Sequence, residues 1–226
     1  ATLNANVMAL GIWTTNQTRL ATSLAEDATV RKLADQLLEE PPPVRREFRP
    51  SPDQEQFVRD LRPRLNQLGY QVAQLVSNNY RLVANSLRPQ WFGNVMVSDA
   101  HTNKYAELFA SGEPVMITPF KPDLLFQRRF RENGDRRQRT NDFRRFNRSG
   151  EENALRRRRG DVTLMQVAAP VRSPDGNVIG ALALIINPDR EFSRILSVAR
   201  SGKSGETYAF DQTGLLISHS RFDAQL

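Results

Sequence analysis

The chain has 226 residues, of which 39% are hydrophobic and 25% are charged, as is typical of a globular protein. It contains no cysteine, which excludes disulfides, thiol catalysis and cysteine-ligated metals. The net charge of +7 comes from one segment, residues 128–160, which holds thirteen arginines and only five acidic residues. The longest apolar run, residues 178–186, is shorter than the ~18 residues that a membrane-spanning helix needs.

The N-terminal residues 1–40 predict one long helix. Leu3, Val7 and Leu10 begin an apolar stripe with helical spacing, and the proline run after residue 40 ends the helix. A straight helix of this length would extend ~57 Å at 1.5 Å per residue, which is about twice the diameter of a small domain. One compact lobe cannot cover such a helix, so we expect a second lobe or a partner helix beside it.

A second helix is predicted over residues 53–85, with Pro63 and Gly69 as the expected kinks. After residue 85 the apolar residues follow the pattern of strands instead of that of a helix. Pro174 and Gly176 predict a hairpin turn between the two strongest strands. The predicted elements after residue 85 are a strand at 92–98, a short helix or strand near Tyr105, strands at 114–120, 161–171 and 177–186, a helix at 188–200 and a hairpin at 206–220.

The arginine-rich segment 128–160 has few apolar residues, so it is interpreted first as a solvated insertion between two strands. The alternative is a contact with phosphate or an acidic surface, because the planar arginine side chain fits such anions. Nucleic acid is not expected as a partner, because no aromatic residues are held on a rigid surface among the arginines.

No enzyme is expected. The two histidines, His101 and His219, lie in or beside predicted turns, and we expect both to be surface or strand-edge side chains. They lack the spacing of a metal site, and the carboxylates are too scattered to pair as acid and base. We therefore expect no catalytic residue, no metal and no cofactor.

The second half of the chain resembles the double-Cache sensor modules of bacterial transmembrane receptors. The resemblance rests on the order of four short motifs: Ala169-Pro170-Val171, Asp175-Gly176, the strand at 178–186, and the stretch 202–219 with its Gly-rich turn and hairpin. A long N-terminal helix beside both lobes is also a feature of this family.

The resemblance implies an α+β, PAS-like Cache fold, in which an antiparallel sheet is flanked by the long N-terminal helix. Residues 1–40 would form that helix, 41–200 the membrane-distal lobe with the insertion 128–160, and 201–226 the start of an incomplete membrane-proximal lobe. It implies an extracytoplasmic, periplasmic sensor of a small molecule, anchored in the inner membrane by its parent receptor. The output of that receptor would be a kinase, a cyclase or a chemoreceptor module.

Candidate ligand-binding residues are polar or aromatic side chains on the predicted strands and their loops. They are Trp91, Asp99, Tyr105, Thr118, Phe120, Lys121 and Gln166. Each also has an ordinary interpretation: Trp91 and Phe120 as core, Gln166 as a solvated strand face, and Lys121 as surface. In the family alignment Ile185 takes the place of an aspartate that binds amines, which makes a free α-amino acid an unexpected ligand.

Two other classes of protein remain as alternatives. A protein-interaction domain that forms a homodimer through the N-terminal helix would bind no small molecule. A binder of acidic polymers through the arginine segment would lose affinity steeply with salt, whereas a sensor of a neutral ligand would not.

Overall fold

The structure is a computed structural model, and it describes residues 2–39, 50–70, 72–86, 99–120, 164–186, 194–196, 207–210 and 214. A five-stranded antiparallel sheet with the order β2-β1-β5-β4-β3 forms its centre. The strands are β1 (Val72–Ser77), β2 (Leu82–Asn85), β3 (Val115–Phe120), β4 (Leu164–Arg172) and β5 (Val178–Ile186). The helices are α1 (Thr2–Glu26), α2 (Ala28–Glu39), α3 (Pro52–Leu68) and α4 (Asp99–Ser111).

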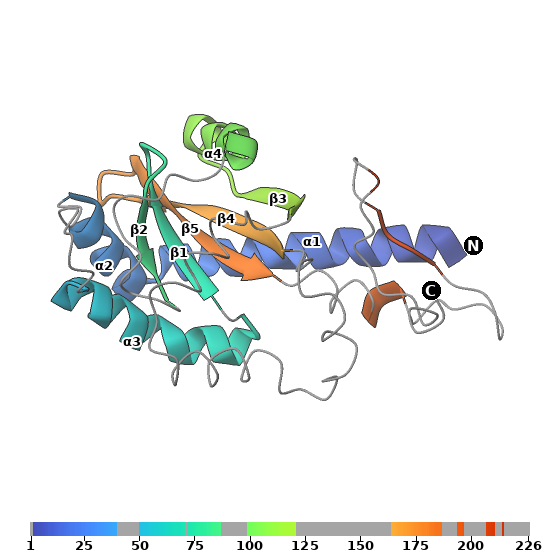
Figure 1. Ribbon diagram of the computed structural model, residues 1–226, viewed down its shortest axis with the longest axis horizontal. Helices are drawn as coiled ribbons and strands as arrows, with labels where there is room; N and C mark the ends of the chain where they lie inside the picture. Colours follow the sequence, from blue (N-terminus) through green and yellow to red (C-terminus); the bar gives the residue numbers. More distant parts are fainter. Residues whose placement is uncertain are drawn as a thin grey trace, which may run out of the picture.

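Helices cover both faces of the sheet (Figure 1). On one face, here called the three-helix face, α1, α2 and α3 pack against Leu75, Val167 and Leu184. On the opposite face, here called the α4 face, α4 packs against Ala168 and Ala183. This α+β arrangement confirms the expected fold class, an antiparallel sheet with a long helix at its side.

The first helical region is divided at Asp27, where the sequence predicts one helix over residues 1–40. Asp27 lies between α1 and α2, and its side-chain oxygen Oδ1 accepts hydrogen bonds from the backbone N–H groups of Thr29 and Val30 at 2.9 and 3.2 Å. This bonding caps the N-terminus of α2, because the first amides of a helix lack partners within it. The expected single 57 Å helix is therefore wrong, and α1 alone spans ~38 Å at 1.5 Å per residue.

The predicted helix over residues 53–85 is correct only to Leu68. Ser51 and Gln54 form a reciprocal capping box at the start of α3, and Gly69 ends the helix in the left-handed conformation at φ 79°. Residues 72–85 form the β1–β2 hairpin instead. The apolar run of β1 is buried along its whole length, and such short runs fit the helical and the strand period equally well.

The three strands expected near 114–120, 161–171 and 177–186 are present as β3, β4 and β5. The turn between β4 and β5 also forms, with Gly176 at φ 87° and its N–H donating to the carbonyl of Ser173 at 2.9 Å. The predicted strand at 92–98, the insertion 128–160 and most of 188–226 lie outside the described residues.

Candidate functional site

The α4 face carries polar side chains in the middle of the sheet. Side chains that are paired directly across neighbouring strands point to the same face. Gln74 pairs with Ala183, which belongs to the core under α4, and with Asn85 on its other side. Gln166 pairs with Ile117 and Ile185, so it lies on this face as well. Three carboxamide side chains therefore lie on the α4 face, and all three are buried.

Tyr105 links α4 to the sheet through one of these carboxamides. It lies in the middle of α4 and is completely buried, and its hydroxyl donates a hydrogen bond to Oε1 of Gln166 at 3.0 Å. Burial raises the pKa of Tyr105, because the charged phenolate would lose its hydration. The phenol therefore keeps its proton and remains a donor to Gln166 at any physiological pH.

The carboxamides of Gln74 and Gln166 have unused hydrogen-bonding capacity. Gln74 is 7% exposed, and within the described residues its side chain makes no hydrogen bond. Gln166 is 6% exposed, and in the same part of the chain only its Oε1 is bonded, which leaves both N–H donors of Nε2 free. Buried polar groups are almost always hydrogen-bonded in folded proteins. The unbonded amide atoms of Gln74 and Gln166 are not among the fully enclosed ones, so water or a ligand can reach them, which makes this face a candidate binding surface.

His101 borders the same face from the first turns of α4. Its ring meets Phe120 edge to face, with the ring centroids 4.1 Å apart at an angle of 70°. The imidazole is 7% exposed, and no described residue forms a hydrogen bond with its Nε2. Burial lowers the pKa of His101, so the ring is neutral near pH 7. The expectation of a surface or strand-edge histidine is therefore wrong for His101.

The structure brings three of the predicted site residues together. Tyr105 and Gln166 are hydrogen-bonded, and Phe120 lies on the α4 face against His101. The ordinary interpretation of Gln166 as a solvated strand residue is wrong, because its side chain is buried.

Of the other predicted residues, only Thr118 has a described side chain. Thr118 is exposed on β3. Asp99 begins α4, but its side chain lies outside the described part of the structure, as do Trp91 and Lys121.

Sequence reasoning missed Gln74 and Asn85, which lie on this face beside Ala183. Gln74 gives the same signal as Gln166, a single polar residue inside a buried apolar run. A helix predicted over residues 53–85 hides this signal, because it includes β1. His101 was missed because its segment was interpreted as a turn.

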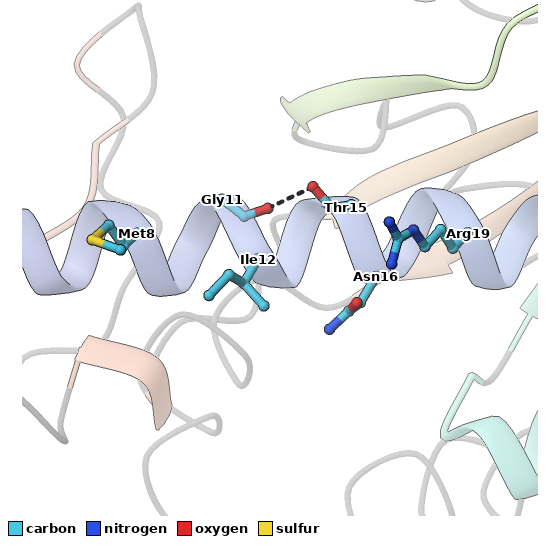
Figure 2. A pocket seen from close by; sticks show the side chains of 6 residues that line it. All are labelled: Met8, Gly11, Ile12, Thr15, Asn16 and Arg19. Atoms are coloured by element: carbon cyan, nitrogen blue, oxygen red, sulfur yellow. Dashed lines mark hydrogen bonds between the residues drawn. The ribbon is translucent and has the colours of Figure 1, made fainter.

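A shallow hollow lies elsewhere, along the N-terminal half of α1 (Figure 2). All six described residues that line it come from this one helix, among them Met8, Ile12 and Arg19. Thr15 bonds back to the carbonyl of Gly11 at 3.0 Å, which satisfies its hydroxyl within the helix. Since one exposed helix cannot enclose a small molecule, the hollow is a weaker candidate than the α4 face.

Neither a metal site nor a membrane-spanning helix lies within the described ranges. These residues contain no cluster of three or more side chains suited to hold a metal ion. Nor does any helix among them have the length and apolar character needed to cross a membrane.

The fold is that of known sensor domains. The chain resembles the sensor domain of the V. cholerae histidine kinase DctB, with a TM-score of 0.51 and 10% identity over 89% of this chain and 57% of that one. It also resembles the ligand-binding domain of the Campylobacter jejuni chemoreceptor Tlp3 in complex with 4-methylisoleucine. That match has a TM-score of 0.50 and 10% identity, over 96% of this chain and 66% of that one.

The chain thus has the fold of these two domains, which agrees with the fold that its sequence motifs imply. It spans less than two thirds of the length of these two structures. The sequence matches no protein-family model and no curated protein. Because one fold hosts many functions, the function has to be argued from the site.

Proposed function

We propose that this chain is the extracytoplasmic ligand-sensing domain of a transmembrane receptor with a kinase, cyclase or chemoreceptor output, and that it binds a small molecule at the α4 face. The observation that supports this most is the buried Tyr105–Gln166 hydrogen bond, which stands beside Gln74, a carboxamide that makes no hydrogen bond within the described chain. The similar structures are sensor and ligand-binding domains, which agrees with the proposal.

Signal transmission follows from the position of β4. Gln166 lies on the α4 face of this strand, while its neighbours Met165 and Val167 belong to the core of the three-helix face, where α1 packs on β4. A ligand bound on the α4 face is therefore separated from α1 only by the thickness of the sheet. Its binding can displace β4, against which α1 packs. We propose that a shift of α1 against the sheet carries the signal toward the membrane.

The test is a thermal-shift screen of the chain against small metabolites, with heparin as a control for the arginine segment. A ligand at a hundred times its Kd stabilises the folded state by ~2.7 kcal/mol, which raises the midpoint of unfolding by roughly 5–10 °C in a chain of this size. A shift produced only by heparin and abolished by salt would favour the arginine segment as the functional part.

Matched tyrosine variants locate the binding surface. Tyr70 on the three-helix face also donates its hydroxyl proton to a glutamine, Gln17 of α1. Tyr105→Phe should weaken the ligand response, whereas Tyr70→Phe should leave it unchanged even though each variant loses a tyrosine–glutamine hydrogen bond. Equal responses in the two variants would contradict a site on the α4 face.

A second candidate function is homodimerisation through α1. Val7, Met8 and Ile12 of this helix are large apolar residues with more than 60% of their surface exposed, and such patches often mark protein contacts. Sedimentation of Ile12→Glu against the unmodified chain tests this. A dimer that dissociates in the variant supports it, and a monomeric unmodified chain refutes it.

A further inference from the structure

The two incompletely bonded carboxamides lie on either side of one residue of β5. Ile185 pairs with Gln166 of β4 on one side and with Val72 of β1 on the other, and Gln74 is two residues further along β1. Neighbouring strands are ~4.8 Å apart and each residue rises ~3.4 Å, so the backbones of Gln166 and Gln74 are about 12 Å apart. A small metabolite can therefore contact both side chains at once.

Ile185 is the accessible point between them. It is partly exposed on the α4 face, whereas the neighbouring residues Ala183 and Val72 are buried. An apolar, partly exposed residue flanked by two polar groups has the usual composition of a small-molecule site, in which a few polar groups orient a ligand on an apolar floor.

The chemistry of this surface is neutral in the part of the chain that the structure describes. The side chains in register with Gln166 are those of Ile117, Ile185 and Val72, and none of them is ionisable. The same holds in the row of Gln74, whose members are Asn85, Ala183, Ala168 and Val115. Neither row supplies a carboxylate for an amine or a cation for a carboxylate.

The unused bonding capacity defines what the ligand must offer. The Oε1 of Gln166 is already bonded to Tyr105, so Gln166 acts mainly as a donor through Nε2. Gln74 can donate and accept side by side, as primary carboxamides do. Its complement is a group with an adjacent acceptor and donor, as found in amides, ureas and nitrogen heterocycles.

We infer that the ligand is an uncharged molecule with an amide, urea or nitrogen-heterocycle edge, which binds over Ile185 between Gln74 and Gln166. The inference rests on the proposed function, because it assigns a ligand class to the same face. It also makes free α-amino acids, which carry both charges, the class that should fail to bind.

The experiment compares neutral compounds with charged ones, and it includes one pair of closely similar shape. Nicotinamide with nicotinate, adenine, uracil and the common amino acids are included in the metabolite library and scored by thermal shift. Stabilisation confined to neutral amides, ureas or heterocycles supports the inference. Stabilisation by charged compounds alone would overturn it while leaving the sensor function intact. A library without any stabilising compound would overturn both.

Gln74→Met and Gln166→Met then test the two carboxamides. Each variant should weaken binding of the neutral hit by about tenfold to a hundredfold, since each removes a buried hydrogen-bond partner. Gln74→Met should change the midpoint of the ligand-free protein little, because the amide that it removes makes no hydrogen bond within the described chain.

Gln54→Met is the matched control. This buried glutamine of the three-helix face is bonded at both ends, to the carbonyl of Val83 at 3.1 Å and to the N–H of Ser51 at 2.8 Å. Its replacement should lower the midpoint and leave ligand affinity unchanged. If Gln74→Met lowers stability as Gln54→Met does and leaves affinity unchanged, Gln74 has a structural role and the inference is wrong.

Discussion

The two faces of the sheet differ in the size of their core side chains and in how their glutamines are bonded. On the three-helix face, large side chains such as Phe57, Leu61 and Leu65 are fully buried, and the glutamine among them, Gln54, is bonded at both ends. On the α4 face, the core residues of β4 and β5 are alanines, and Gln74 and Gln166 have unused donors within the described chain.

This difference separates stability from function. On our proposal, the three-helix face supplies most of the stability of the domain, and the α4 face keeps polar groups available for a ligand. Variants on the two faces should therefore differ in which property they change.

The largest effect is expected from Phe57→Ala in α3. Phe57 is fully buried in the three-helix core, and such truncations cost about 3–5 kcal/mol through lost burial and the cavity that remains. Urea denaturation measures the loss. Leu68→Ala in the same helix is the control, since Leu68 is 39% exposed and should change the free energy of unfolding by about 0.5 kcal/mol or less.

Gly180→Ala tests how closely β5 is packed on the three-helix face. A Cβ atom at this position would lie 2.7 Å from the carbonyl oxygen of Val76 and 2.8 Å from Cδ1 of Leu38. Overpacking of this kind costs about 1–3 kcal/mol. A Cβ atom at Gly11 in α1 would have no atom within 4 Å. Gly11→Ala should therefore stabilise the chain by about 0.5–1 kcal/mol, because alanine favours a helix more than glycine does. If chemical denaturation showed that both variants change the free energy of unfolding in the same direction, the close packing at Gly180 would be contradicted.

Asp27→Ala should loosen the junction of the scaffold helices. Asp27 caps α2 and forms an ion pair with Arg64 of α3, with Nη1 and Oδ1 2.5 Å apart. The loss of such a cap costs about 1 kcal/mol. Asp27→Asn keeps the cap but removes the charge, so it should retain most of the stability.

The stability that Asp27 contributes should depend on pH. Partial burial alone would raise the pKa of Asp27, but the bonds from Arg64 and from the backbone amides of Val30 and Thr29 outweigh it and lower the pKa. The contribution is therefore present above the unfolded-state pKa of 3.8 and is lost as the pH falls through the lower folded-state pKa. Denaturation series from pH 5 to pH 2 should show the difference between Asp27→Ala and the unmodified chain narrowing toward the acid end. A constant difference would contradict the ion pair.

The smallest effect is expected at His101 on the α4 face. Because burial lowers the pKa of His101 below 6.5, the unfolded state binds a proton more readily than the folded one. The unmodified chain should therefore lose stability relative to His101→Gln as the pH falls from about 6.5 toward 5, and should show no relative change above pH 7. Parallel stability curves across this range would show that the imidazole is hydrated in the folded protein.

Sequence reasoning predicted β3, β4 and β5 because turn residues and short apolar runs mark them locally. It misassigned β1 and β2, since the run around Leu75 satisfies the helical period as well, and only the sheet determines which period applies. The break at Asp27 depends on a side chain bonding its own backbone, and nothing in the hydrophobic pattern reports that.

The candidate site was predictable only where a residue stands out in its local sequence. Gln166 interrupts an apolar strand and could be noticed from the local sequence. Gln74 becomes part of the site only because the sheet order places β1 beside β5, which is far from it in the chain. Pairing between distant strands is a property of the fold, which the local sequence does not encode.

The central claim, that the α4 face binds the ligand, is tested most directly by hydrogen exchange of the chain with and without a stabilising compound. The account predicts that added protection is concentrated in α4, β4 and β5 around Tyr105, Gln166 and Ile185, with little change in α2 and α3. Protection confined to residues 8–19 of α1, beside the hollow of Figure 2, would contradict it.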